Sequence, residues 1–136
     1  MGIYGTGQPK IITSASNTVY LNYVKILEDG PDFKRLEHKS KIDGDRTFYG
    51  KGFFWKYKIL MHLFRYNNPR SKFEELEAAL YDSVTLYRHS DGDPIKDADD
   101  NNCPFFFAES QRIYMENRFY RDGLILTFES ERGVVV

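Results

Sequence analysis

Residues 53–64, FFWKYKILMHLF, constrain the fold of this chain more than any other stretch. Its odd-numbered positions are all apolar or aromatic, and half of its even-numbered positions are polar. Because successive side chains of a strand point to opposite faces, this alternation predicts a strand with one buried face. Twelve residues would extend roughly 40 Å. Most strands have about 5–6 residues, so we expect this one to bend or to project beyond its sheet.

Other segments show strand and turn patterns of the same kind. Further strands are predicted at 18–27, 33–42, 84–88, 104–110, 112–120 and 123–130. Gly, Pro and Asp predict turns at 28–32 (EDGPD), 43–46 (DGDR) and 120–123 (YRDG). Gly50 and Gly52 suggest a bulge or a close backbone approach. The closing RGVVV is interpreted as a frayed tail or as a strand that pairs with a neighbouring chain.

A single helix is predicted at about residues 71–82. Ser71 followed by Glu74 is a capping-box pattern, which marks a helix start. One apolar stripe at helical spacing is expected to pack on the sheet: Phe73, Leu76, Leu80 and Tyr81. The chain, residues 1–136, is therefore predicted to be one mainly β (α+β) domain, a β-sandwich or barrel of about seven or eight antiparallel strands with one packed helix. The expected core includes Trp55, Tyr57, Ile59, Leu76, Leu80, Leu124 and Leu126.

The residues that carry most enzyme chemistry do not form a recognisable site. The chain has 1 cysteine, so no disulfide forms within it, and the aspartates beside Cys103 disfavour a thiolate. The 3 histidines are far apart in sequence and lack metal-ligand spacing. Asp97, Asp99 and Asn101 match the first ligands of a calcium loop, but Ala108 stands where a glutamate is needed. We predict no catalytic, cofactor-binding or metal residues and leave calcium at the acidic loop 89–103 open.

Charge is distributed unevenly along the chain, although the net charge is only −1. Residues 1–72 carry 13 basic against 6 acidic side chains, and residues 73–136 carry 6 against 14. A basic and an acidic face would suit head-to-tail self-association. A nucleic-acid-binding domain is usually basic overall, so no specific nucleic-acid partner is expected. No run of 18 apolar residues exists, so no membrane partner is expected either.

Two surfaces are predicted to contact other subunits. The outer face of the long strand combines lysines with apolar side chains, which need a covering partner: Phe54, Lys56, Lys58, Leu60 and Phe64. The acidic loop has almost no apolar anchor, and we expect it to be mobile in the free subunit and to contact a neighbour: Asp91, Asp93, Asp97 and Asp99.

The order of the parts resembles a known family. A long aromatic strand (RTFYGKGFFWKYKILMHLF) precedes the helix SKFEELEAALY, then SVTLYRHSDGD, PFFFAES and a closing YRDGLILTFES. Across roughly residues 18–130 this layout resembles the small structural proteins of bacteriophage tails, namely tail-tube, distal-tail and tube-adaptor proteins.

The resemblance implies a non-enzymatic virion subunit, assembled in the host cytoplasm. It would form homo-oligomeric rings and contact other tail proteins, without a cofactor. The alternative is a monomeric binding module, either a capsid decoration protein or a β-barrel that binds single-stranded nucleic acid.

Overall fold

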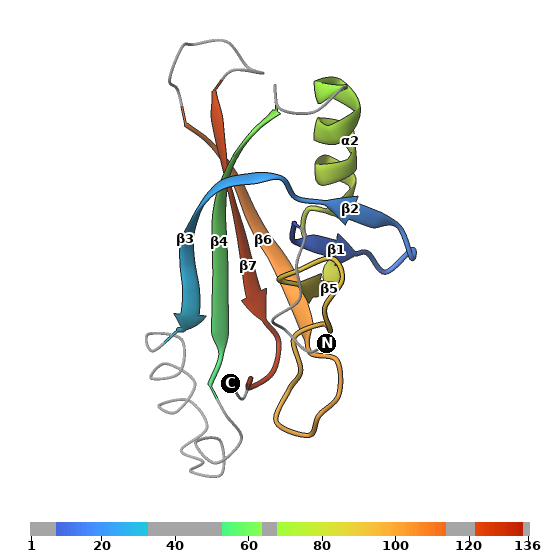
Figure 1. Ribbon diagram of the computed structural model, residues 1–136, viewed down its shortest axis with the longest axis vertical. Coiled ribbons are helices and arrows are strands. Elements are labelled where there is room, and N and C mark those ends of the chain that lie inside the picture. The colour runs from blue at the N-terminus through green and yellow to red at the C-terminus, as the bar shows by residue number, and fades with distance from the viewer. Residues whose placement is uncertain (1–7, 33–52, 64–67, 114–121, 135–136) are drawn as a thin grey trace.

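The computed structural model describes residues 8–32, 53–63, 68–113 and 122–134. In chain order these form β1 (Lys10–Ile12), β2 (Thr18–Tyr20), β3 (Tyr23–Pro31), β4 (Trp55–His62), α2 (Pro69–Ala79), β5 (Ser83–Tyr87), β6 (Pro104–Ile113) and β7 (Gly123–Ser130). The predicted mainly β fold with one helix is confirmed for this part of the chain (Figure 1). The predicted strand 33–42, the turn 43–46, Gly50 and Gly52 lie outside the described residues, as do the first two residues of the turn 120–123.

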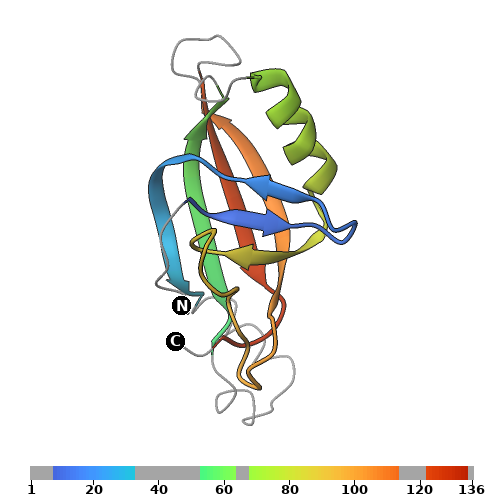
Figure 2. The same cartoon turned by 45° about the vertical axis from the view of Figure 1, so that its right-hand side comes forward.

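The described strands form one antiparallel sheet in the order β2-β1-β5-β6-β7-β4-β3. The sheet curls over itself, so that β1, β2 and β5 cross in front of β4, β6 and β7 (Figure 2). The core lies between these two halves. The sheet thus encloses its core as the two halves of a sandwich do, although the strands belong to a single hydrogen-bonded sheet.

The alternation predicted for the central strand is confirmed. Every odd-numbered residue from Trp55 to Leu63 is buried, and the even-numbered residues from Lys56 to His62 are only half-buried. The strand is shorter than predicted, because β4 has 8 residues rather than twelve. Phe53 instead forms an isolated bridge with Val134, so the chain leaves the ladder before Trp55. Val134 therefore pairs within its own chain, so neither interpretation of the closing residues holds at Val134, and the last two residues lie outside the described part of the chain.

The first predicted strand and turn need a correction. Residues 18–27 do not form one strand, because Leu21 and Asn22 separate β2 from β3. The predicted turn at 28–32 belongs mostly to β3, which continues through Pro31. Proline lacks a backbone N–H and is tolerated on an edge strand, and in the described sheet β3 lies at the edge.

The helix begins and ends earlier than predicted. Asn68, not Ser71, is the N-cap, and its Oδ1 accepts a hydrogen bond from the Ser71 N–H at 3.1 Å. Pro69 occupies the first helical position, where its missing N–H costs nothing. The helix ends at Ala79 because Leu80 is extended and Tyr81 adopts a φ of 68°. The Tyr81 N–H then donates to the Phe107 carbonyl, which directs the chain into β5.

The core matches the prediction at six of the seven named positions. Trp55, Tyr57, Ile59, Leu76, Leu124 and Leu126 are buried. Leu80 is only partly buried, because it lies beyond the end of the helix, and Tyr81 is exposed. The helix is instead held by Leu76 and Ala79.

Candidate functional site

β4 lies between β3 and β7, so the side chains on its outer face have neighbouring strands of the same chain on both sides. Lys58 lies across from Glu28 on β3, and Lys56 lies across from Glu129 on β7. Opposite charges in such cross-strand positions stabilise the pairing within one chain. Phe54 is 5% exposed, so the expectation that it lies on an exposed face is wrong. Lys56, Lys58 and Leu60 are half-buried there, and Phe64 lies outside the described residues.

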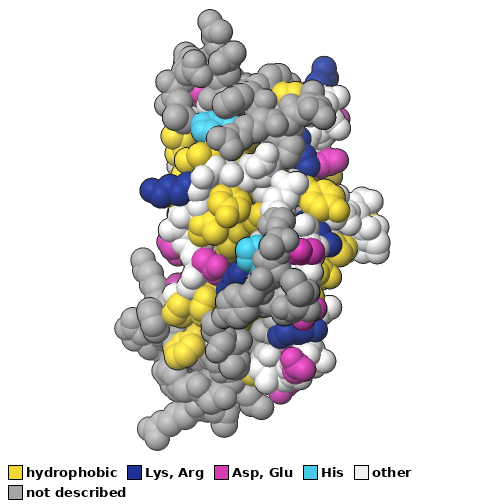
Figure 3. Space-filling view, in the orientation of Figure 1, with side chains coloured by type: hydrophobic (Ala, Val, Ile, Leu, Met, Phe, Trp, Pro, Cys, Tyr) yellow, Lys and Arg dark blue, Asp and Glu magenta, His cyan; other side chains and the backbone are white. Residues whose placement is uncertain are grey.

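The sheet edge formed by β3 carries a concentration of exposed apolar side chains. In the described part of the chain β3 is paired with β4 on one side and ends the sheet on the other. Val24, Ile26 and Leu27 are 39%, 40% and 38% exposed. Figure 3 shows hydrophobic side chains interspersed with charged ones on the side where β3 runs. An edge of this length with exposed apolar residues is a template for pairing with another strand.

A polar cluster fastens β3 to the opposite half of the sheet. The Asp29 carboxylate accepts hydrogen bonds from Arg88 Nε at 2.8 Å and from Arg88 Nη2 at 2.9 Å. Trp55 Nε1 donates to the same carboxylate at 2.6 Å, and the Arg88 guanidinium lies over the Trp55 ring. Such a two-pronged arginine–carboxylate pair holds both groups in a fixed geometry. The cluster therefore fixes where the β3 edge sits.

Tyr57 is a buried polar group close enough to this cluster for the charges of Asp29 and Arg88 to act on it. Its side chain is fully buried, and its hydroxyl has no hydrogen-bond partner in the described residues. Burial raises the pKa of Tyr57 above its ordinary value, and the negative charge of Asp29 raises it further. A phenol held neutral in this way is a packing group rather than a general acid near neutral pH.

The acidic loop is built around Asp97. Its Oδ1 accepts hydrogen bonds from the backbone N–H groups of Asp99 and Asn101, at 2.9 Å and 3.0 Å. Its Oδ2 lies 3.3 Å from Nη1 of Arg132. Oδ1 is thus hydrogen-bonded within the loop, whereas Oδ2 has the ion pair with Arg132 but no hydrogen bond in the described residues. No group of three or more candidate metal ligands occurs in the described ranges. Asp97 organises the loop, which argues against its expected role as a surface contact.

The acidic loop is also anchored to the core by buried apolar side chains. Ile95 is 1% exposed, its N–H donates to the Leu86 carbonyl, and its carbonyl accepts from the Cys103 N–H. Cys103 is fully buried, and burial raises the pKa of its thiol. The expectation of almost no apolar anchor is therefore wrong. Three of the predicted contact residues remain exposed: Asp91, Asp93 and Asp99.

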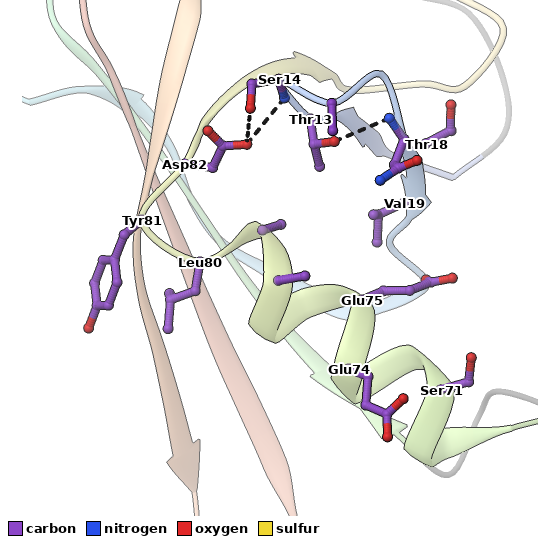
Figure 4. Close-up of a pocket in the computed structure, with 14 residues that line it drawn as sticks. Thr13, Ser14, Thr18, Val19, Ser71, Glu74, Glu75, Leu80, Tyr81 and Asp82 are labelled. Carbon is purple, nitrogen blue, oxygen red and sulfur yellow. Dashed lines mark hydrogen bonds between the residues drawn. The ribbon is translucent and has the colours of Figure 1, made fainter.

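A groove lies between α2 and the hairpin formed by β1 and β2 (Figure 4). It encloses about 810 Å³, within the range of about 300–1,000 Å³ that ligand pockets occupy. Its charged lining side chains are Glu74, Glu75 and Asp82. Asp82 accepts hydrogen bonds from the Ser14 hydroxyl at 2.8 Å and from the Ser14 N–H at 3.1 Å. These two hydrogen bonds are the main cause of the lowered pKa of Asp82.

The sequence predicted neither the β3 edge nor the groove. The groove combines segments far apart in the chain, so no local pattern marks it. The β3 edge does carry a signal in the sequence: Val24, Ile26 and Leu27 do not follow one alternation, as expected of a strand whose two faces are not clearly inside and outside. In the structure, this irregular pattern coincides with two shifts in the β3–β4 register, at Tyr23/Lys25 and Ile26/Glu28.

Comparisons with known proteins identify no protein similar to this chain. A scan against protein-family models finds no match, and searches of curated proteins and of solved structures find none either. No helix within residues 8–32, 53–63, 68–113 and 122–134 is long and apolar enough to cross a membrane. The β3 edge and the groove are therefore the two candidate functional surfaces of the described chain.

Proposed function

We propose that this protein is a non-enzymatic structural subunit that assembles with copies of itself, as a ring-forming protein of a bacteriophage tail. The proposal of self-assembly rests on the β3 edge, because β3 has 9 residues and is the last strand of the described sheet. The tail setting rests on the sequence layout alone. Localisation to the virion and contacts with other tail proteins are parts of the same proposal.

The three exposed apolar side chains of β3 would gain stability from a covering strand. A second strand would cover Val24, Ile26 and Leu27, removing apolar area from water at roughly 25 cal/mol per Å². The same strand would satisfy the outward backbone groups of the edge. The two register shifts and Lys25 are features that discourage unspecific pairing, so they narrow the choice of partner strand.

Charge favours one orientation of a partner copy. Lys25 precedes Ile26 and Leu27, whereas Glu28 follows them. An antiparallel pair centred between Ile26 and Leu27 places Lys25 of each copy opposite Glu28 of the other, while an in-register parallel pair brings like charges together. A two-fold contact of this kind yields pairs, and closing them into a ring requires a second contact. The exposed aspartates of the acidic loop are our candidates for that second contact.

The test removes the apolar edge without changing the core. Ile26→Lys should weaken self-association by at least about tenfold, because it places charge in the proposed contact. Gln111→Lys is the matched control, since Gln111 is exposed on β6, where it pairs with Ile125 of β7 and lies outside the β3 edge, and the added charge is the same. Sedimentation velocity over a range of protein concentrations measures the association, and electron micrographs show whether rings form.

The outcomes separate the proposal from its alternative. Association lost in Ile26→Lys and retained in Gln111→Lys supports the proposal. A wild-type protein that stays monomeric up to about 1 mM contradicts it. A monomer that forms a salt-sensitive complex with single-stranded oligonucleotides would instead favour the binding module.

A further inference from the structure

The groove beside α2 includes the other edge of the described sheet. The sheet order places β2 at its end, and Thr18 and Val19 of β2 are among the groove-lining residues. Figure 4 shows the open space between the hairpin and the helix, with Glu75 and Thr18 on its two sides. A groove between a strand edge and a helix has the shape that an extended segment fits, because one wall offers backbone groups and the other offers side chains.

The backbone of β2 presents a hydrogen-bonding edge to this groove. In an antiparallel ladder, alternate residues direct both N–H and C=O toward the same neighbour. The Leu21 N–H donates to the Pro9 carbonyl and the Thr13 N–H donates to the Asn17 carbonyl, so odd-numbered residues of this hairpin face β1. The carbonyl of Tyr20 faces the other way, because it accepts from Nζ of Lys72 on α2 at 3.0 Å. By the same alternation, the N–H and C=O of Thr18 face the groove.

The negative charge of the groove favours a partner with basic side chains. The charged residues among its lining are three carboxylates, Glu74, Glu75 and Asp82. Arg70 lies 3.4 Å from Glu74, and Lys72 lies 3.0 Å from Glu75. The side chains of Glu74 and Glu75 remain 64% and 45% exposed, so these pairs are weak and leave both carboxylates accessible.

We propose that this groove binds an extended, lysine- or arginine-rich segment of a partner protein, which adds to the sheet as a strand beside β2. Backbone hydrogen bonds to Thr18 align the segment, and its basic side chains contact Glu74 and Glu75. Lys72 already donates a hydrogen bond to the Tyr20 carbonyl, so that carbonyl is not available to the segment and the site ends there. The segment therefore runs from Thr18 toward Ser14 and Asp82. The site is distinct from the β3 edge and does not depend on self-assembly.

The first measurement tests the charge requirement. The probe is a fluorescein-labelled ten-residue peptide of alternating lysine and threonine, titrated with the full chain at low salt and followed by fluorescence anisotropy. The double variant Glu74→Gln/Glu75→Gln should bind the probe at least about tenfold more weakly. Glu77→Gln is the matched control, because Glu77 is exposed on the same helix but does not line the groove, and it should bind as the wild type does.

The second measurement tests strand addition without altering the protein. Two further peptides are N-methylated, one at every lysine and the other at every threonine, so that each loses the backbone donors of one strand edge. The two methylated peptides should differ in affinity by at least about tenfold, because only one edge of the added strand faces β2. Equal affinities of both methylated peptides and the unmethylated probe would mean non-directional charge attraction and overturn the proposal. Equal binding of a glutamate–threonine peptide, or no binding up to about 1 mM, overturns it too.

Discussion

The two edges of the described sheet are built in opposite ways. β3 has 9 residues, with three exposed apolar side chains in its first half. β2 has 3 residues, and a helix lies beside it with Lys72 bonded to its last carbonyl. Short length and a covering helix are two of the means by which proteins protect sheet edges. The contrast suggests that β2 admits only a narrow, charge-selected segment, whereas β3 offers a broad surface suited to another subunit.

The edges differ although they are consecutive in the chain. Leu21 and Asn22 join β2 to β3, and Leu21 is fully buried. Before Leu21 the alternation is regular, with Val19 buried between exposed neighbours. After it, the register shifts disturb the alternation. The position of a buried leucine therefore separates a regular edge from an irregular one.

The largest effect is expected where the helix is anchored beside β2. Leu76→Ala should lower the free energy of unfolding by about 2–5 kcal/mol, because Leu76 is 2% exposed between helix and sheet. Leu80→Ala should cost less, because Leu80 is only partly buried. Chemical denaturation measures both variants. Equal losses for the two would contradict the assignment of Leu76 as the main anchor.

A smaller loss is expected from the cluster that fixes β3. Asp29→Asn removes the charge that holds Arg88, and we expect a destabilisation of about 1–3 kcal/mol. Asp99→Asn is the control, since Asp99 is exposed and its carboxylate is not part of the cluster. Thermal and urea unfolding, with hydrogen exchange of the β3 amides, measure the effect. Unchanged exchange in β3 would show that the cluster does not hold this edge.

The hairpin that carries β2 allows a stabilising substitution. Ser16 has a φ of 66°, a region that glycine adopts without steric cost. Ser16→Gly should therefore raise the free energy of unfolding, by at most about 1 kcal/mol. Ala15→Gly should lower it, because Ala15 is not among the positive-φ residues of the described chain. Opposite signs in urea denaturation support the assigned turn, and a loss for Ser16→Gly contradicts it.

The smallest effect concerns Asp82 at the far end of the groove. Its folded pKa lies below the ordinary value of 3.8 because Ser14 donates to its carboxylate. A lowered folded pKa contributes stability above the unfolded pKa, and that contribution is lost as pH falls below 3.8 through the folded pKa. Ser14→Ala should raise the pKa of Asp82, as measured by NMR titration of its side chain. An unchanged titration would mean that the hydroxyl does not set this pKa.

The elements of the fold differ in how well the sequence alone predicts them. The alternation of residues 53–64 predicted β4 and its buried face correctly, since a half-buried strand has a clear period of two. The motif EDGP was wrongly predicted to be a turn, because turn residues are tolerated at an open edge that only the tertiary arrangement defines. The N-cap is Asn68 rather than the predicted Ser71; both residues are good caps, and Pro69 is the signal in the sequence that distinguishes them.

The candidate surfaces were less predictable than the fold. A period of two assigns Phe54 to the outer face, but the chain leaves the strand before Trp55 and buries Phe54. The polar composition of residues 89–103 did not reveal that Ile95 and Asp97 fasten this loop to the core and to its own backbone. Contacts between distant segments decide both cases, and a single sequence does not display such contacts.

The pairing of distant strands also has a consequence for the rate and order of folding. Lys56 of β4 pairs with Glu129 of β7, and Lys10 of β1 pairs with Tyr87 of β5, so the centre of the sheet depends on segments far apart in the chain. Non-local topologies of this kind fold slowly, typically in about milliseconds to seconds. Until β3 pairs with β4, its exposed apolar side chains have no neighbouring strand, and intermediates that expose such strands aggregate. Slower synthesis at low temperature should therefore increase the soluble yield of this protein more than that of the Ile26→Lys variant, whose intermediates expose less apolar surface.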